Sequence, residues 1–103
     1  MELAELQAWT KEALALLTRE GWTKKSYRVK DETGHVTYCL VGAALAARRA
    51  EDGEDVWRDG STGAGRYEIP FAEYTGQLAY LVNDSAESIE DLEQKLKELG
   101  VLA

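Results

Sequence analysis

The segment from Tyr38 to Ala47 constrains the fold most strongly, because ten consecutive apolar residues occur there in a chain of 103. This run is too short to cross a bilayer. A helix that is apolar nearly all round is typical of a buried, central element. Its glycine and alanines would let neighbouring helices approach closely. We therefore predict a central helix over residues 39–50, with Arg48 and Arg49 near its C-terminus, where cations are favoured.

Three further helices are expected around this central one. Residues 2–20 show the periodicity of an amphipathic helix, which Gly21 ends. The apolar face of this helix comprises Leu3, Leu6, Trp9, Ala13 and Leu16. A final helix is expected to begin near Ser88, where Asp84-x-x-Glu87 and Ser88-x-x-Asp91 both have capping-box spacing, and to end at Gly100.

Between them, Pro70 is expected to open a third helix, since proline is favoured at the first helical position. Asn83-Asp84-Ser85 is expected to break this helix. Its predicted buried stripe comprises Phe71, Tyr74, Leu78, Leu81 and Val82.

Residues 26–38 predict one small antiparallel β-hairpin. Two alternating segments flank the turn Asp31-Glu32-Thr33-Gly34, in which glycine supplies a positive φ. If Lys30 faces His35, then Val29 pairs with Val36 and Tyr27 with Tyr38, which places all four on one face. The expected fold is therefore mainly α, with about four helices and one hairpin in a single domain over 1–103.

Residues 51–68 form the irregular part of this expectation, because glycines and acidic residues occur there without periodicity. Residues 51–103 carry four Lys/Arg and thirteen Asp/Glu, a balance of −9 in a chain of net charge −7. An acidic half of this kind repels phosphate backbones, so nucleic acid is a disfavoured partner.

The leading hypothesis is a non-enzymatic protein-interaction module that binds a protein with a basic surface. Trp57 among acidic residues has the composition of an interaction anchor, although it could equally fold inward onto the core. The candidate partner-binding residues are Asp52, Glu54, Asp55, Trp57 and Asp59.

Two alternatives remain open. Cys39 lies near a predicted helix N-terminus, which favours a thiolate, so a Cys39-dependent enzyme or redox sensor with His35 and Asp84 is conceivable. The simpler interpretation is that Cys39 is a buried cysteine of the core. The basic residues from Lys24 to Lys30, next to Trp22 and Tyr27, would suit a nucleic-acid binder, but such a cluster is more often a solvated face.

Neither a cofactor nor a metal is expected. One cysteine and one histidine supply no zinc-ligand set, and the Gly60–Gly65 run lacks the context of a phosphate-binding loop. The acidic N-terminus and the single cysteine favour a cytoplasmic protein.

Three segments resemble a small domain-of-unknown-function family of actinobacteria, other bacteria and their phages. They are Gly21-Trp22-Thr23-Lys24, Tyr38-Cys39-Leu40-Val41-Gly42-Ala43 and Asn83-Asp84. The chain departs from the family pattern at Val82, where an aromatic residue is common. The resemblance implies an architecture and a host context but no mechanism. A phage or mobile-element origin would favour an inhibitor of a host defence protein.

Overall fold

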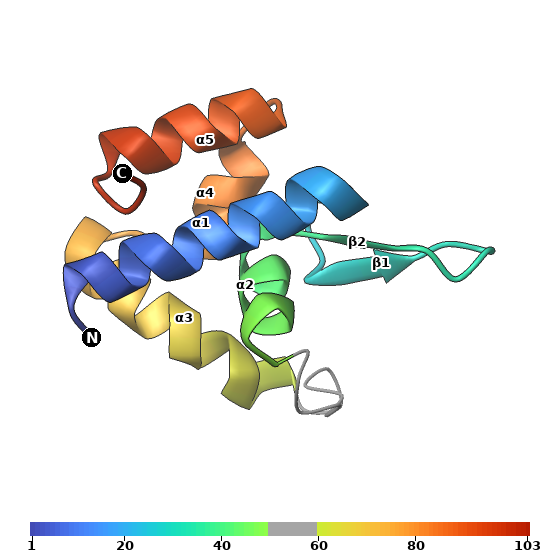
Figure 1. The fold of residues 1–103 in the computed structure, drawn as a ribbon, viewed down its shortest axis with the longest axis horizontal. Helices are drawn as coiled ribbons and strands as arrows, with labels where there is room; N and C mark the ends of the chain where they lie inside the picture. The colour runs from blue at the N-terminus through green and yellow to red at the C-terminus, as the bar shows by residue number, and fades with distance from the viewer. Residues whose placement is uncertain (50–59) are drawn as a thin grey trace.

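The computed structural model describes residues 1–49 and 60–103. Its elements are α1 (Leu3–Glu20), β1 (Arg28–Lys30), β2 (Val36–Tyr38), α2 (Leu40–Arg49), α3 (Gly60–Thr75), α4 (Ala79–Ser85) and α5 (Ile89–Glu98). The described chain is mainly helical with one two-stranded antiparallel hairpin, as predicted. In Figure 1 the helices gather around α1 and α2, and the hairpin projects away from them.

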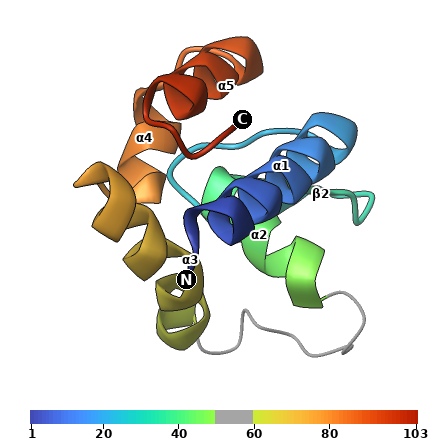
Figure 2. The ribbon, with the colours of Figure 1, turned by 60° about the vertical axis from the view of Figure 1, so that its left-hand side comes forward.

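The apolar segment that begins at Cys39 forms the centre of the core, which confirms the prediction. Its buried side chains, each at most 2% exposed, are Cys39, Leu40, Val41, Ala43, Ala44 and Leu45. α1 lies against α2 in both views (Figures 1 and 2), and the Trp9 indole N–H donates to the Ala44 carbonyl at 2.7 Å. Such close contact is possible because α2 presents alanine side chains there.

α1 buries one face and ends where its sequence predicts. Leu6, Trp9, Ala13 and Leu17 are buried, whereas Leu3 at the first position of the helix is 38% exposed. Gly21 ends the helix with φ 122° and donates from its N–H to the Leu17 carbonyl at 2.8 Å. A Cβ at this glycine would lie 2.7 Å from Thr37 Cγ2, so the position also sets the approach of β2 to α1.

α3 begins ten residues before the predicted start, so the expectation of an irregular segment through residue 68 is wrong for residues 60–68. Residues 51–59 of that segment lie outside the described part of the chain. Ala64, Tyr67, Glu68 and Phe71 are buried at helical spacing. Packing of this face outweighs the low helix propensity of the glycines, and Pro70 is accommodated inside the helix.

The predicted helix from Pro70 to Val82 is interrupted instead at Gly76, which has φ 71°. α4 then runs through Asn83-Asp84-Ser85, the residues expected to break a helix. The carboxylate of Glu68 accepts from the N–H groups of Ala79 at 3.1 Å and Tyr80 at 3.0 Å, which satisfies donors at the start of α4. This tertiary contact has no signature in local sequence.

The interruption changes which side chains of the predicted stripe are buried. Phe71 and Val82 are buried, as expected. Tyr74, Leu78 and Leu81 are 43%, 38% and 51% exposed, so their predicted burial is wrong. Because α4 is a separate helix, it does not continue the buried stripe of α3. The apolar residues of the predicted stripe therefore divide between the core and the surface.

The hairpin forms where it is predicted, but its predicted register is wrong by one residue. The pairs are Arg28 with Tyr38, Val29 with Thr37, and Lys30 with Val36. One Asp31 carboxylate oxygen accepts from the N–H groups of Thr33 and His35, and the Asp31 N–H donates to the His35 carbonyl at 2.9 Å. This loop places Asp31 opposite His35, and the shift leaves Val29 44% exposed.

α5 is confirmed with the second of its two possible caps. The Ser88 hydroxyl accepts from the Asp91 N–H at 3.0 Å, and the Asp91 carboxylate accepts from the Glu87 N–H at 3.0 Å. Gly100 ends the helix with φ 80°. Leu92 and Leu96 are buried against the rest of the core.

A buried polar contact joins α1 to α3 and provides a test of this packing. The Thr10 and Tyr67 hydroxyls are 2.6 Å apart, and both side chains are fully buried. We expect Thr10→Val and Tyr67→Phe each to lower the free energy of unfolding by about 1–2 kcal/mol, since each leaves one buried hydroxyl unsatisfied. The double variant should lose less than the sum of the two. Additive losses in urea unfolding would contradict a direct hydrogen bond.

Candidate functional site

The buried side chain of Asn83 in α4 joins three segments that are far apart in the sequence. Its Oδ1 accepts from the Trp22 indole N–H at 2.7 Å and from the Leu40 N–H at 3.0 Å. Its Nδ2 donates to the Thr23 carbonyl at 3.1 Å and to Asp84 Oδ1 at 3.2 Å. We call Asn83 with these four partners the Asn83 junction. One amide thereby provides an acceptor for a backbone N–H in the first turn of α2 and connects this turn to the chain that follows α1.

The Asn83 junction brings together the three segments on which the family resemblance rests. Trp22 and Thr23 belong to the first, Leu40 to the second, and Asn83 with Asp84 to the third. Their separation in sequence gives no indication that they meet.

Asp84 extends this junction toward the surface. Its Oδ1 accepts from the Lys25 backbone N–H at 2.9 Å. Lys25 has φ 66°, in the left-handed region that is unfavourable for residues other than glycine. The hydrogen bond to Asp84 helps to hold this unusual turn in place.

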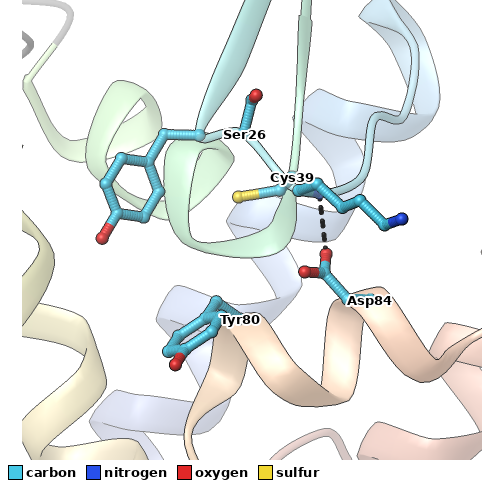
Figure 3. A pocket seen from close by; sticks show the side chains of 6 residues that line it. Ser26, Cys39, Tyr80 and Asp84 are labelled. Carbon is cyan, nitrogen blue, oxygen red and sulfur yellow. Dashed lines mark hydrogen bonds between the residues drawn. The ribbon is translucent and has the colours of Figure 1, made fainter.

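A pocket of about 360 Å³ opens beside Asp84, between the start of the hairpin, the N-terminus of α2 and α4 (Figure 3). Its described lining residues are Lys25, Ser26, Tyr27, Cys39, Tyr80 and Asp84. In Figure 3 the Cys39 thiol, the Tyr80 ring and the Asp84 carboxylate border the same space. Sequence reasoning connected Asp84 with Cys39 only as a hypothetical triad, and it missed Ser26 and Tyr80 because their spacing forms no motif.

Burial and nearby carboxylates keep the Cys39 thiol protonated. The residue is only 2% exposed. Burial raises the pKa of Cys39 above its ordinary value, and the carboxylates of Asp84 and Glu68 raise it further, despite a hydrogen bond from the Gly42 N–H at 3.3 Å. Burial also raises the pKa of Glu68 itself. Burial and these carboxylates together disfavour a thiolate nucleophile at Cys39.

His35 contacts a different part of the molecule from Cys39. Its Nε2 lies 2.5 Å from the Glu20 carbonyl oxygen, and its Nδ1 lies 3.9 Å from the Glu20 carboxylate. His35 is absent from the described lining of the pocket. The hypothetical Cys39–His35 pair is thus not assembled at this pocket.

The other sequence-predicted residues fall into two groups. Asp52, Glu54, Asp55, Trp57 and Asp59 lie outside the described residues. Of the basic cluster, Lys24 places its ammonium 5.2 Å from the centre of the Trp22 ring, Lys25 lines the pocket, and Arg28 and Lys30 lie on β1. These cations are therefore distributed over the segment before the hairpin and its first strand.

Within residues 1–49 and 60–103, no three His, Cys, Asp or Glu side chains are grouped so that they could hold a metal ion. In the same part of the chain, no helix combines the length and the apolar character that a membrane span needs.

No protein-family model, curated protein or solved structure matches the chain. The family resemblance drawn from the three segments therefore stays a prediction.

The Asn83 junction predicts a large effect of a single substitution. We expect Asn83→Ala to lower the free energy of unfolding by about 3 kcal/mol, because it leaves the Trp22 indole N–H and the Leu40 N–H without their acceptor. Trp22→Phe removes only one of these donors and should cost about half as much. Equal, small losses for both variants in urea unfolding would contradict the junction.

The environment of Cys39 predicts low reactivity. We expect iodoacetamide at neutral pH to modify the folded protein at least about tenfold more slowly than the urea-unfolded chain, since the thiol is buried and its pKa is raised. Modification of the folded protein at the rate of a free cysteine would contradict this and would revive the enzyme or redox-sensor hypothesis.

Proposed function

We propose that the domain is a non-enzymatic protein-binding module, and that its partner presents a basic surface. The observation that carries this proposal is a group of exposed apolar side chains at the start of α4, followed along the chain by acidic residues on α4, in the turn after it and on α5. Leu81 is 51% exposed, Tyr80 41% and Leu78 38%. Asp84 follows Tyr80 by one helical turn, and exposed Glu87 and Glu90 come next. We call these six residues the α4 face, although Leu78 immediately precedes α4, Glu87 lies between α4 and α5, and Glu90 lies on α5.

The composition of the α4 face suits a protein interface. Tyrosine is enriched at interface centres, and charged residues form the rim. The two lysines of α5 pair with acidic residues of their own helix, since Lys95 lies 3.6 Å from Asp91 and Lys97 lies 3.5 Å from Glu93. Since these two cations already have acidic partners, the acids of the α4 face favour a basic partner.

Two further aspects belong to the same proposal. The protonated, buried thiol of Cys39 supports a binding role over Cys39 catalysis, and the free cysteine suits the cytoplasm as the place of action. In a phage or mobile element, such a module would act by covering a basic site on a host defence protein.

Affinity capture of the partner from a lysate of the source organism tests this function. We expect Leu81→Gln to reduce recovery of the same partner about tenfold, because truncation of a central apolar contact typically costs more than 1 kcal/mol. Val29→Thr is the matched control, since Val29 is 44% exposed on the hairpin. Recovery should also fall as the salt concentration rises.

Charge variants separate the acidic contribution from the apolar one. Glu87→Gln with Glu90→Gln should weaken capture and flatten its salt dependence, whereas Glu32→Gln in the hairpin turn should change neither. The sequence-predicted residues are tested separately by Asp55→Ala, Trp57→Ala and Asp59→Ala combined. Undiminished recovery of the same partner by both sets of α4-face variants would overturn the proposed binding face.

A further inference from the structure

The pocket beside Asp84 has the size of a site for a side chain or a small ligand. Its volume of about 360 Å³ is at the lower end of the range typical of ligand pockets. It is open to solvent next to the exposed Tyr80 of the α4 face. A group that projects from a partner docked on that face could therefore enter it.

Asp84 provides a fixed acceptor in this pocket. The Lys25 N–H and Asn83 Nδ2 both donate to Oδ1, so the carboxylate is held in one orientation. Figure 3 shows the second oxygen turned toward the space between Tyr80 and Cys39. Among the described residues, no hydrogen bond reaches that oxygen. A held carboxylate with one available oxygen is prepared to accept from a ligand N–H.

The remaining lining favours a cation over an anion or a neutral group. The negative charges of Asp84 and Glu68 both raise the pKa of Cys39 at the pocket, and that of Glu68 also raises the pKa of Tyr27. Aromatic rings with nearby carboxylates attract cations through the negative face of the ring. The ammonium of Lys25 opposes this preference, so the bound cation must make direct contacts that offset the repulsion.

Among biological cations, a guanidinium fits these contacts best. It is planar, so it can lie flat on the Tyr80 ring while its edge N–H groups point outward to acceptors. Asp84 Oδ2 is such an acceptor, and Figure 3 shows it turned toward the space beside Tyr80. An ammonium group is more strongly hydrated and has no flat face, so it gains less from this arrangement.

We infer that this pocket binds an arginine side chain, with the guanidinium stacked on Tyr80 and donating to Asp84. The inference rests on the proposed function, because the arginine would come from the basic surface of the partner. Arginine at this position anchors that partner to the α4 face. It also explains why a binding face would include a cavity with a fixed carboxylate.

The test uses N-acetyl-L-arginine amide as the probe and follows backbone amide signals of the full chain by NMR. We expect saturable shifts at residues 25–27, 39, 80 and 84, with a dissociation constant of about 1 mM, as suits a ligand of this size. N-acetyl-L-citrulline amide has nearly the same shape without charge and should bind at least about tenfold more weakly. N-acetyl-L-lysine amide should also bind more weakly.

Matched variants assign the two contacts. Asp84→Asn retains an oxygen that can accept from the Lys25 N–H but removes the charge, and should weaken binding about tenfold. Tyr80→Leu should weaken it about fivefold, whereas Tyr80→Phe, which keeps the ring, should not. Tyr74→Leu on α3, with similar exposure, is the control for loss of a surface tyrosine.

The outcomes distinguish this inference from the proposed function. Equal binding of the arginine and citrulline probes, equal binding of arginine and lysine probes, or unchanged binding by Asp84→Asn and Tyr80→Leu would each overturn the arginine site. Partner capture that depends on Leu81 but not on Tyr80 or Asp84 would overturn it while leaving the binding module intact. Arginine binding without partner capture would support the pocket and contradict the module.

Discussion

The amide of Asn83 is the interaction on which the rest of the site depends. It is fully buried, and its two polar atoms contact the chain after α1, the first turn of α2, and the neighbouring Asp84. Because a buried amide needs partners for both its donor and its acceptor groups, these contacts favour the observed position of α4 relative to α2. The arrangement of the adjoining pocket therefore depends on this contact in the core.

The same contact explains how a surface site arises from a small core. Asn83 faces inward, and the next residue, Asp84, faces the pocket, where it holds the turn at Lys25. Tyr80 lies one helical turn earlier on α4, and Cys39 immediately precedes α2. A short helix thus contributes a core anchor, an acidic acceptor and an exposed ring within five residues. Its outward side belongs to the α4 face proposed to bind a partner.

The elements with strong local signals could be predicted from the sequence. The apolar run of α2, the periodicity of α1 and the Ser88 cap of α5 are local features, and all three elements form there. The start of α3, the break at Gly76 and the hairpin register could not be predicted. They depend on the packing of Tyr67 and Phe71, on the Glu68 carboxylate, and on the Asp31 loop, which are contacts between or within folded elements.

The candidate site was less predictable than the fold. Ser26, Cys39, Tyr80 and Asp84 come from separate parts of the chain, and no spacing rule connects them. Cys39 and Asp84 lie in segments that carry the family resemblance, but the resemblance implied no role for either residue. The residues predicted to bind a partner between Asp52 and Asp59 lie outside the described chain and stay predictions.

Native-state hydrogen exchange at the Trp22 indole N–H tests the central contact most directly. This N–H and the Leu40 N–H donate to the same buried oxygen, so one opening of the Asn83 junction should expose both. We expect the two to exchange with similar protection, comparable to that of the buried Trp9 indole N–H. Rapid exchange of the Trp22 indole, at the rate of an exposed tryptophan, while Leu40 stays protected, would contradict the account.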